Sequence, residues 1–213
     1  MAPMDRSQRR IAFVTTTGVG FLGAVALAAR ALRPRGDDSS PLPGDDLVPG
    51  ATIVETHQID IDAPAATIWP WLVQLGYGRG GFYSFDLLER LAGVGMTNAR
   101  RVEPQWQDLA VGDQVRLAAD AALAVARLEP ERCLVLSSDG GAAPPGAGMD
   151  FDFSWAFVLD EPGGLGSGGC RLRIRERYRP RRGATTAVVR AMRPVARLMT
   201  YGMMWGLRRR CRA

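Results

Sequence analysis

Two groups of residues in this 213-residue chain could carry chemistry, and the first is a glycine-rich stretch. In GYGRGG, Gly76, Gly78 and Gly81 satisfy the G-x-G-x-x-G pattern of loops that let the pyrophosphate of a dinucleotide approach the backbone. That mechanism needs a strand before the glycines and a helix after them. The neighbouring elements therefore decide whether the pattern has this meaning.

The second group is Glu55 and His57, which stand two residues apart. If their segment is a strand, both side chains lie on one face, and a carboxylate beside an imidazole can act as a general acid–base pair. His57 is the only histidine of the chain, and spacing places no nucleophile or third partner beside it. The pair is a candidate for catalysis, and a partly exposed polar histidine is the alternative.

The rest of the composition excludes several kinds of site. Three cysteines without a C-x-x-C spacing exclude a cysteine zinc site and a disulfide framework, and one histidine excludes a histidine-rich metal site. We expect no metal and no cofactor.

After Cys170 the chain has fourteen arginines and one acid, a charge of +13 against −8 for the remainder. Because that acidic remainder can neutralise the arginines and no aromatic-basic repeat accompanies them, we expect no nucleic-acid partner.

The elements around the glycines answer the nucleotide question. Residues 52–61, TIVETHQIDI, are rich in β-branched residues and predict a strand. The next segment repeats its apolar residues with the period of a helix: Ile68, Trp71, Leu72 and Leu75. Pro70 should kink or divide this helix. The glycines follow it, so we expect a turn towards a second helix at 84–93, with Gly76 as the helix cap and no bound NAD or ATP.

The rest of the chain predicts strands and a closing helix. Apolar runs at 114–118, 122–130 and 132–138 are separated by turn signals. Strict alternation sends one set of residues to a single side of the next strand: Phe151, Phe153, Trp155, Phe157 and Leu159. Residues 170–180 alternate apolar residues with arginines and complete a hairpin with an arginine outer face. From about 184 to 210 the period is helical, with a bend at Pro194 and an apolar stripe of Val188, Met192, Val195, Met199 and Met203.

The N-terminal end predicts a membrane anchor within residues 1–30. Residues 11–29 are an uncharged run that spans about 28 Å as a helix, close to the thickness of a bilayer. Three arginines flank each side, so the side of the membrane stays open. A cleaved signal peptide is the alternative. Residues 31–50, rich in Pro, Gly and Asp, predict a linker, and we expect the folded domain from 51 to 213.

With this order of elements, three stretches resemble the START-like helix-grip superfamily (SRPBCC), and more narrowly its bacterial polyketide cyclase/dehydrase and lipid-transport-like branch. They are IDAPAATIWPWLVQLGYGRGGFYSFDLLERL, PQWQDLAVGDQV and SWAFVL, and the likeness covers about residues 50–210. The resemblance implies an α+β fold in which a curved antiparallel sheet and a long C-terminal helix enclose an apolar cavity for a lipid, sterol or polyketide. It implies no particular reaction, because many members of this branch have no assigned activity.

An apolar cavity with a few polar groups is the usual design of a small-molecule site. We expect its lining to be Tyr77, Arg79, Tyr83, Phe151, Phe153, Trp155, Phe157, Met199 and Met203. The alternative for the apolar residues is ordinary core packing, and Arg79 could pair with Asp86 or Glu89 instead of an acidic ligand head group.

Two function classes fit these candidates. One is a membrane-tethered binding or transfer domain for an apolar molecule, and the other is an enzyme of the cyclase, dehydrase or hydrolase type. An enzyme should place titratable groups with perturbed pKa in the cavity, whereas a carrier can have a purely apolar one. We favour the carrier, and the sequence leaves the oligomeric state open.

Overall fold

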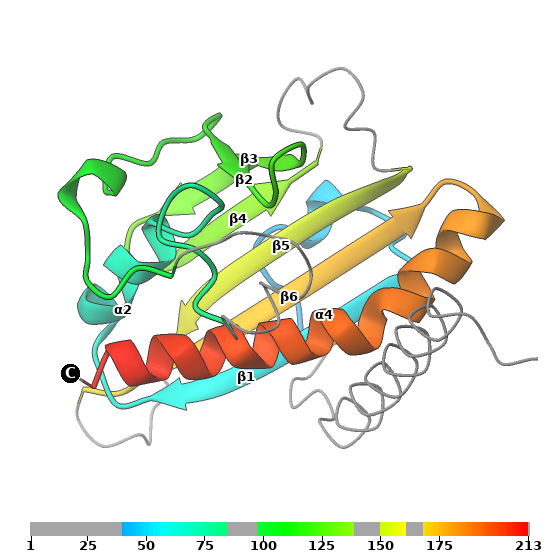
Figure 1. The fold of residues 1–213 in the computed structure, drawn as a ribbon. Coiled ribbons are helices and arrows are strands. Elements are labelled where there is room, and N and C mark those ends of the chain that lie inside the picture. Colours follow the sequence, from blue (N-terminus) through cyan, green and yellow to red (C-terminus); the bar gives the residue numbers. More distant parts are fainter. Residues whose placement is uncertain (1–39, 85–97, 139–149, 161–167, 213) are drawn as a thin grey trace, which may run out of the picture.

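The computed structural model describes residues 40–84, 98–138, 150–160 and 168–212. These residues build one antiparallel sheet of six strands with a long helix laid across it (Figure 1). The strands are β1 (Ile53–Ile61), β2 (Gln114–Arg116), β3 (Ala122–Glu129), β4 (Cys133–Ser137), β5 (Phe151–Asp160) and β6 (Cys170–Pro180). The helices are α2 (Ala65–Val73) and α4 (Gly183–Arg210), and two short 3-10 turns are η1 (Asp45–Leu47) and η2 (Pro104–Trp106).

The strand order is β1-β6-β5-β4-β3-β2, so the first strand pairs with the last one. β1 and β6 pair along the whole of β1, from Ile53 opposite Tyr178 to Ile61 opposite Cys170. β5 and β6 form the predicted hairpin. A curved antiparallel sheet crossed by a C-terminal helix is the predicted α+β helix-grip architecture. Membership of the superfamily, and of its narrower branch, stays a prediction.

α2 is a single helix although it contains Pro70. The sequence predicted a kink or a division here, and the helix is not divided: it runs from Ala65 to Val73. Pro70 removes the N–H that would bond to the carbonyl of Ala66, one turn earlier. Ala66 is exposed, so water can bond to that carbonyl. The helix therefore tolerates the hydrogen bond that is missing at Pro70.

The glycine-rich stretch after α2 is a closed turn. Gly76 and Gly81 exchange two backbone hydrogen bonds of 3.1 Å each. Gly76, Gly78 and Gly81 have φ angles of 130°, 76° and 74°, which side chains rarely allow. The N–H groups of Tyr77, Arg79 and Gly80 also donate to backbone carbonyls. Most of the amides that a phosphate would need are thus already bonded. The glycines follow a helix, as predicted, but the C-cap of that helix is Gln74 and not the predicted Gly76. The second predicted helix, beyond Ser84, lies outside the described residues.

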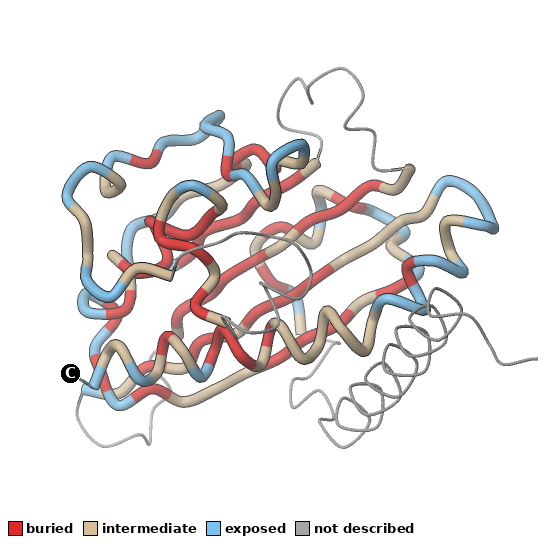
Figure 2. Tube along the Cα trace, in the orientation of Figure 1, coloured by how far each residue is buried: buried red, intermediate tan, exposed pale blue. Residues whose placement is uncertain are grey.

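α4 is the predicted closing helix, but the face that meets the sheet differs from the predicted one. Val188 and Met192 of the predicted stripe are 62% and 55% exposed. Figure 2 shows that the first turns of α4 are largely exposed and that buried residues gather in its second half. From Val189 to Thr200 the sheet-facing positions lie one residue after the predicted ones, at Val189, Arg193, Ala196 and Thr200, whereas Met203 of the predicted stripe is itself buried. Glu55 of β1 lies under this helix and binds Arg193, and this contact fixes the rotation.

Residues 40–50, which the sequence assigned to a linker, cover the outer face of the sheet. Leu42 is 6% exposed and Val48 is fully buried. Leu42 belongs to a second apolar cluster with Cys133, Val135, Ala156 and Val158. Within residues 40–50 the regular structure is limited to the short 3-10 turn η1, but irregular backbone can still pack. The folded domain therefore includes residues from 40 onward.

The arginine outer face of β6 is neutralised by acids from elsewhere in the fold, as predicted. The guanidinium of Arg175 is 1% exposed and bonds to Asp45 at 2.7 Å. Arg171 pairs with Asp60 at 2.7 Å. Arg173 and Arg179 pair with Asp160 and Asp152 at 2.5 and 2.6 Å. These arginines are engaged within the domain.

Candidate ligand cavity

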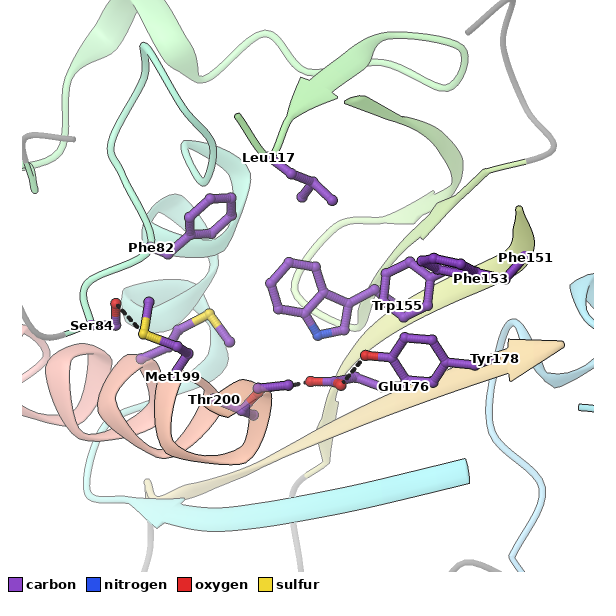
Figure 3. A pocket seen from close by; sticks show the side chains of 12 residues that line it. Phe82, Ser84, Leu117, Phe151, Phe153, Trp155, Glu176, Tyr178, Met199 and Thr200 are labelled. Atoms are coloured by element: carbon purple, nitrogen blue, oxygen red, sulfur yellow. Dashed lines mark hydrogen bonds between the residues drawn. The ribbon is translucent and has the colours of Figure 1, made fainter. Parts of the chain in front are cut away.

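An apolar cavity of about 310 Å³ lies between the inner face of the sheet and α4 (Figure 3). Its walls are Phe82 and Ser84 after the glycine turn, Leu117 after β2, Phe151, Phe153 and Trp155 of β5, Glu176 and Tyr178 of β6, and Ala196, Met199, Thr200 and Met203 of α4. The volume is at the lower end of the range of about 300–1,000 Å³ that is usual for small-molecule pockets.

The aromatic wall of the cavity comes from the strict alternation along β5. Because every second side chain of a strand points to the same face, Phe151, Phe153 and Trp155 all turn towards α4. The ring of Phe153 packs on the ring of Tyr178 at 4.6 Å between centroids. Phe82 packs on Trp155 at 5.8 Å. These tilted aromatic contacts fix the positions of the rings that form the wall.

One polar cluster interrupts the apolar wall, and its centre is Glu176. This glutamate is 4% exposed and lies on the inner face of β6. The hydroxyl of Tyr178 donates to Glu176 Oε2 at 2.7 Å, and the hydroxyl of Thr200 donates to Oε1 at 2.7 Å. Both carboxylate oxygens thus accept a hydrogen bond. Burial, together with the nearby Glu176 charge, raises the pKa of Tyr178 well above its usual value, so the phenol keeps its proton.

Trp155 adds an unsatisfied donor to this cluster. It lies directly opposite Glu176 on the neighbouring strand. Its indole nitrogen is buried, and within the described part of the chain it has no hydrogen-bond partner. Figure 3 shows this nitrogen on the side of the ring that is turned towards Glu176 and Thr200. A buried N–H without a partner is rare in folded proteins.

A second charged cluster lies beside the cavity, under α4. Its centre is Glu55, which stands opposite Glu176 on the neighbouring strand β1 and is 2% exposed. Arg193 and Arg197 of α4 both donate to its carboxylate, Arg197 at 2.7 Å. Burial pushes the pKa of Glu55 upward, but His57, Arg197 and Arg193 together outweigh it and lower this pKa to about 2. Glu55 is therefore a fixed anion at neutral pH.

His57, the other catalytic candidate, is enclosed beneath the same helix. It is fully buried, and its Nε2 lies 3.5 Å from Glu55 Oε2. The ring meets Tyr201 edge-on at 5.2 Å and does not line the cavity. The predicted pair is therefore adjacent, but neither residue lines the cavity, and a carboxylate with so low a pKa is a poor base. Across residues 40–84, 98–138, 150–160 and 168–212, His, Cys, Asp and Glu form no group of three that could hold a metal ion.

Two predicted loop residues do not reach the cavity. The guanidinium of Arg79 donates to the carbonyls of Val73 at 3.1 Å and Trp106 at 2.8 Å, which ties the end of α2 to η2. Its predicted partners, residues 86 and 89, lie outside the described residues. Tyr77 lies against the guanidinium of Arg116 instead, 5.3 Å from its ring centroid. Their place in the lining has to be corrected, because Arg79 binds carbonyls of α2 and η2 and Tyr77 contacts Arg116 of β2.

Tyr83 and Phe157 support the cavity from behind. Tyr83 is 2% exposed, and its hydroxyl donates to the carbonyl of Trp71 at 2.9 Å. Burial raises the pKa of this phenol. Its positive φ of 57° turns the chain so that the residues on either side, Phe82 and Ser84, face the cavity. Phe157 is fully buried 4.8 Å behind the ring of Trp155. Neither residue lines the cavity, which corrects the prediction.

Of the predicted lining, the structure brings Phe151, Phe153, Trp155, Met199 and Met203 together. Sequence reasoning missed the polar cluster. Glu176 had a visible signal: it occupies an apolar position in the alternation of its strand, and a glutamate there is expected to be buried and to need hydrogen-bond partners. Thr200 was hidden by the one-residue shift of the helix stripe. Leu117 had a signal, because it alternates with Val115 in the predicted strand 114–118, whereas Phe82 lies in a segment without periodicity.

A smaller hollow of about 130 Å³ adjoins the cavity at the N-terminal half of α4. The two share Phe151, Glu176, Tyr178 and Ala196. Its far side includes Glu55 and Arg193, together with the exposed side chains of Val188 and Met192. The apolar space therefore continues along α4 towards the surface.

No family model matches this chain, and no curated protein matches it. Protein MLL2253 of Mesorhizobium loti is a similar solved structure, with 17% identity over 74% of this chain and 96% of that chain and a TM-score of 0.42. A conserved protein of Geobacillus kaustophilus has 12% identity over 75% of this chain and 95% of that chain, with a TM-score of 0.43. CalU16 of Micromonospora echinospora has 16% identity over 75% of this chain and 83% of that chain, with a TM-score of 0.34. Likenesses this distant leave the function to be argued from the residues of this chain.

Proposed function

We propose that this domain binds and carries an apolar small molecule, such as a lipid, a sterol or a polyketide-like compound. The cavity between β5, β6 and α4 carries the proposal. The space of about 310 Å³ is partly open to solvent and is walled mainly by aromatic rings and methionines. An apolar occupant would remove this apolar surface from water, which is favourable.

The groups in the cavity favour a carrier over an enzyme. Its titratable side chains in the described residues are Glu176 and Tyr178, and they are bonded to each other. The raised pKa of Tyr178 keeps it protonated, so it does not serve as a base at neutral pH. The candidate pair Glu55 and His57 lies under α4, where Glu55 is held by two arginines. A cyclase or hydrolase remains the alternative that substrate turnover would reveal.

Ligand-dependent stability tests the proposal. A ligand held only by the native state raises its stability, by about 2.7 kcal/mol at roughly one hundred times the dissociation constant. We expect the neutral apolar dye N-phenyl-1-naphthylamine to bind the full-length protein saturably and to raise its melting temperature. Trp155→Ala and Met199→Ala, which change the cavity wall, should reduce both effects under conditions where each variant is folded.

Met204→Ala is the matched control for this test. Met204 is 1% exposed on the same helix, like the neighbouring Met203, but it does not line the cavity. Its truncation should lower stability by a few kcal/mol, as is usual for a core methionine, and leave dye affinity unchanged. Equal loss of affinity in both methionine variants, or no binding by the wild-type protein, would refute the proposal.

The proposal includes a membrane tether through residues 11–29. Its support is the uncharged run of nineteen residues between arginines. This run lies outside the described residues, and within those ranges no helix is long and apolar enough to cross a membrane. A tether would keep the cavity near a reservoir of apolar molecules. Recovery of full-length protein in the soluble fraction after an alkaline carbonate wash would overturn this part of the proposal.

A further inference from the structure

The arrangement of donors and acceptors in the cavity restricts the chemistry of its ligand. Trp155 offers an indole N–H that has no partner among the described residues. Glu176, directly opposite it on β6, offers carboxylate oxygens. A carboxylate can accept about four hydrogen bonds, and Tyr178 and Thr200 supply one to each oxygen. One side of the cavity therefore holds a free donor next to an acceptor with spare capacity.

We infer that the ligand is a neutral molecule that carries a hydroxyl group, bound between the Trp155 indole and the Glu176 carboxylate. The inference rests on the proposed function and specifies its ligand. A hydroxyl is both donor and acceptor, so one oxygen accepts the bond from Trp155 Nε1 and donates a bond to Glu176. The rest of the molecule is apolar, because the remaining wall is formed mainly by aromatic rings, Leu117 and methionines.

The same geometry disfavours a free carboxylic acid. Tyr178 and Thr200 each donate a hydroxyl hydrogen bond to Glu176, so both of its oxygens act as acceptors. A ligand carboxylate placed beside it would bring two like charges together in an apolar space, where their repulsion is strong. Arg193 and Arg197, which could offset that charge, are committed to Glu55. A fatty-acid head group therefore has no cation free to receive it among the residues lining this part of the cavity.

Three ligands of one shape test the inference on the full-length protein. They are 2-naphthol, which is neutral and carries the hydroxyl, 2-methylnaphthalene, which lacks a polar group, and 2-naphthoate, which is anionic at neutral pH. Since a buried hydrogen bond contributes about a factor of ten, we expect 2-naphthol to bind about tenfold more tightly than 2-methylnaphthalene. We expect 2-naphthoate to bind most weakly of the three.

Two variants separate the donor from the acceptor. Trp155→Phe keeps an aromatic ring and removes the N–H, so the preference for 2-naphthol over 2-methylnaphthalene should fall to about threefold or less, while the affinity for 2-methylnaphthalene changes little. Trp205→Phe, at an α4 position that is 61% exposed, is the matched control and should keep the full preference. Glu176→Gln removes the charge, and it should raise the affinity for 2-naphthoate relative to 2-methylnaphthalene by about tenfold.

The outcomes distinguish this inference from the proposed function. If no ligand of the three binds, the proposed function itself fails. If all three bind with equal affinity, or if 2-naphthoate binds best, the cavity binds ligands but the inference is wrong. A tenfold preference for 2-naphthol that survives Trp155→Phe would also contradict it. The ranking of the three ligands on the wild-type protein tests the preference for a hydroxyl even if a variant does not fold, and Trp155→Phe tests whether the indole N–H supplies it.

Discussion

Two buried glutamates define the charge of the site at the scale of single residues. Glu55 and Glu176 lie opposite each other on adjacent strands, and like charges in this position are destabilising. The two glutamates have different partners. Arg193 and Arg197 bind Glu55. The hydroxyls of Tyr178 and Thr200 bind Glu176. One glutamate is thereby a structural anion, and the other is left to face the cavity.

The low pKa of Glu55 predicts a pH dependence of stability. Its folded pKa of about 2 lies below the ordinary value of 4.5, so this group stabilises the protein fully above about pH 4.5 and loses the effect as the pH falls through about 2. The contribution is on the order of 3 kcal/mol. Glu55→Gln should therefore be destabilised by about that amount at pH 7, and its deficit relative to wild type should shrink between pH 4.5 and 2, as measured by urea unfolding.

Asp62→Asn is the control for this pH series. Asp62 is 69% exposed and pairs with Arg212 at the surface, and such pairs contribute about 0–1 kcal/mol. Its removal should leave the pH profile of stability nearly unchanged. A deficit of Glu55→Gln that stayed constant from pH 7 to pH 2 would show that the loss comes from packing rather than from the charge.

The sequence could predict which residues of β5 line the cavity, because the period of a strand is fixed at two and the aromatic residues follow it without interruption. It could not predict the roles of Arg79 or Tyr83. Both lie in a turn whose path depends on three glycines with positive φ, and their partners, such as Trp106 and Trp71, come from distant parts of the chain. Contacts of this kind have no local signal.

At the scale of elements, the position of α4 decides the shape of the cavity. Apolar periodicity alone predicted a stripe that included Val188 and Met192, because it assumed that arginines face water. The buried Glu55 reverses this assumption for Arg193, so the sheet-facing stripe of the first half of α4 is shifted by one residue, while Met199 and Met203 keep their predicted side. The existence and length of the helix were thus predictable, and its rotation depended on a charge contributed by β1, far away in the sequence.

The second half of α4 passes very close to the loop that forms the opposite cavity wall. A Cβ built on Gly206 would collide with the backbone oxygen of Tyr83. Gly206 therefore permits the close contact with Tyr83. This contact sets the distance between α4 and two cavity-lining residues, Phe82 and Ser84, which flank Tyr83 in the chain. A glycine inside a helix usually costs about 1 kcal/mol relative to alanine, so this close approach offsets a loss of helix stability.

Gly206→Ala should lower the stability of the protein for this reason. We expect a loss of about 1–3 kcal/mol from overpacking, although alanine favours the helix. Gly183→Ala is the matched control, because nothing lies within 4 Å of a Cβ at that first position of α4. It should be neutral or stabilising by up to about 1 kcal/mol. Chemical denaturation of the two variants measures the difference, and equal effects would show that the contact with Tyr83 is not restrictive.

At the scale of the whole molecule, the sheet has a different task on each face. Its inner face and α4 enclose the cavity. Its outer face is covered by residues 40–50, through the side chains of Leu42 and Val48 and through hydrogen bonds from Arg175 to Ser40 and Asp45. The order of the elements was predictable because each strand and helix has its own period. The covering of the outer face was not, because a segment rich in Pro, Gly and Asp carries no period that reveals burial.

Two truncations separate this covering segment from the proposed tether. A fragment of residues 40–213 keeps every described contact of the outer face and loses the uncharged run at 11–29. We therefore expect it to be as stable as the full-length chain and to be recovered in the soluble fraction, whereas the full-length chain stays with membranes after a carbonate wash. Stability is measured by urea unfolding, and location by immunoblotting of the two fractions.

A fragment of residues 51–213 should be soluble but less stable. It exposes the surface that Leu42 and Val48 cover, and each of these side chains contributes about 1.5–3 kcal/mol when buried. It also leaves the guanidinium of Arg175 with Thr56 but without Asp45 or the carbonyl of Ser40. Removing one partner of a buried charge typically costs about 3–5 kcal/mol. Because these losses together approach the whole stability of an ordinary domain, about 5–15 kcal/mol, we expect this fragment to be partly unfolded at 37 °C. If both fragments unfolded at the same urea concentration, residues 40–50 would be a linker after all.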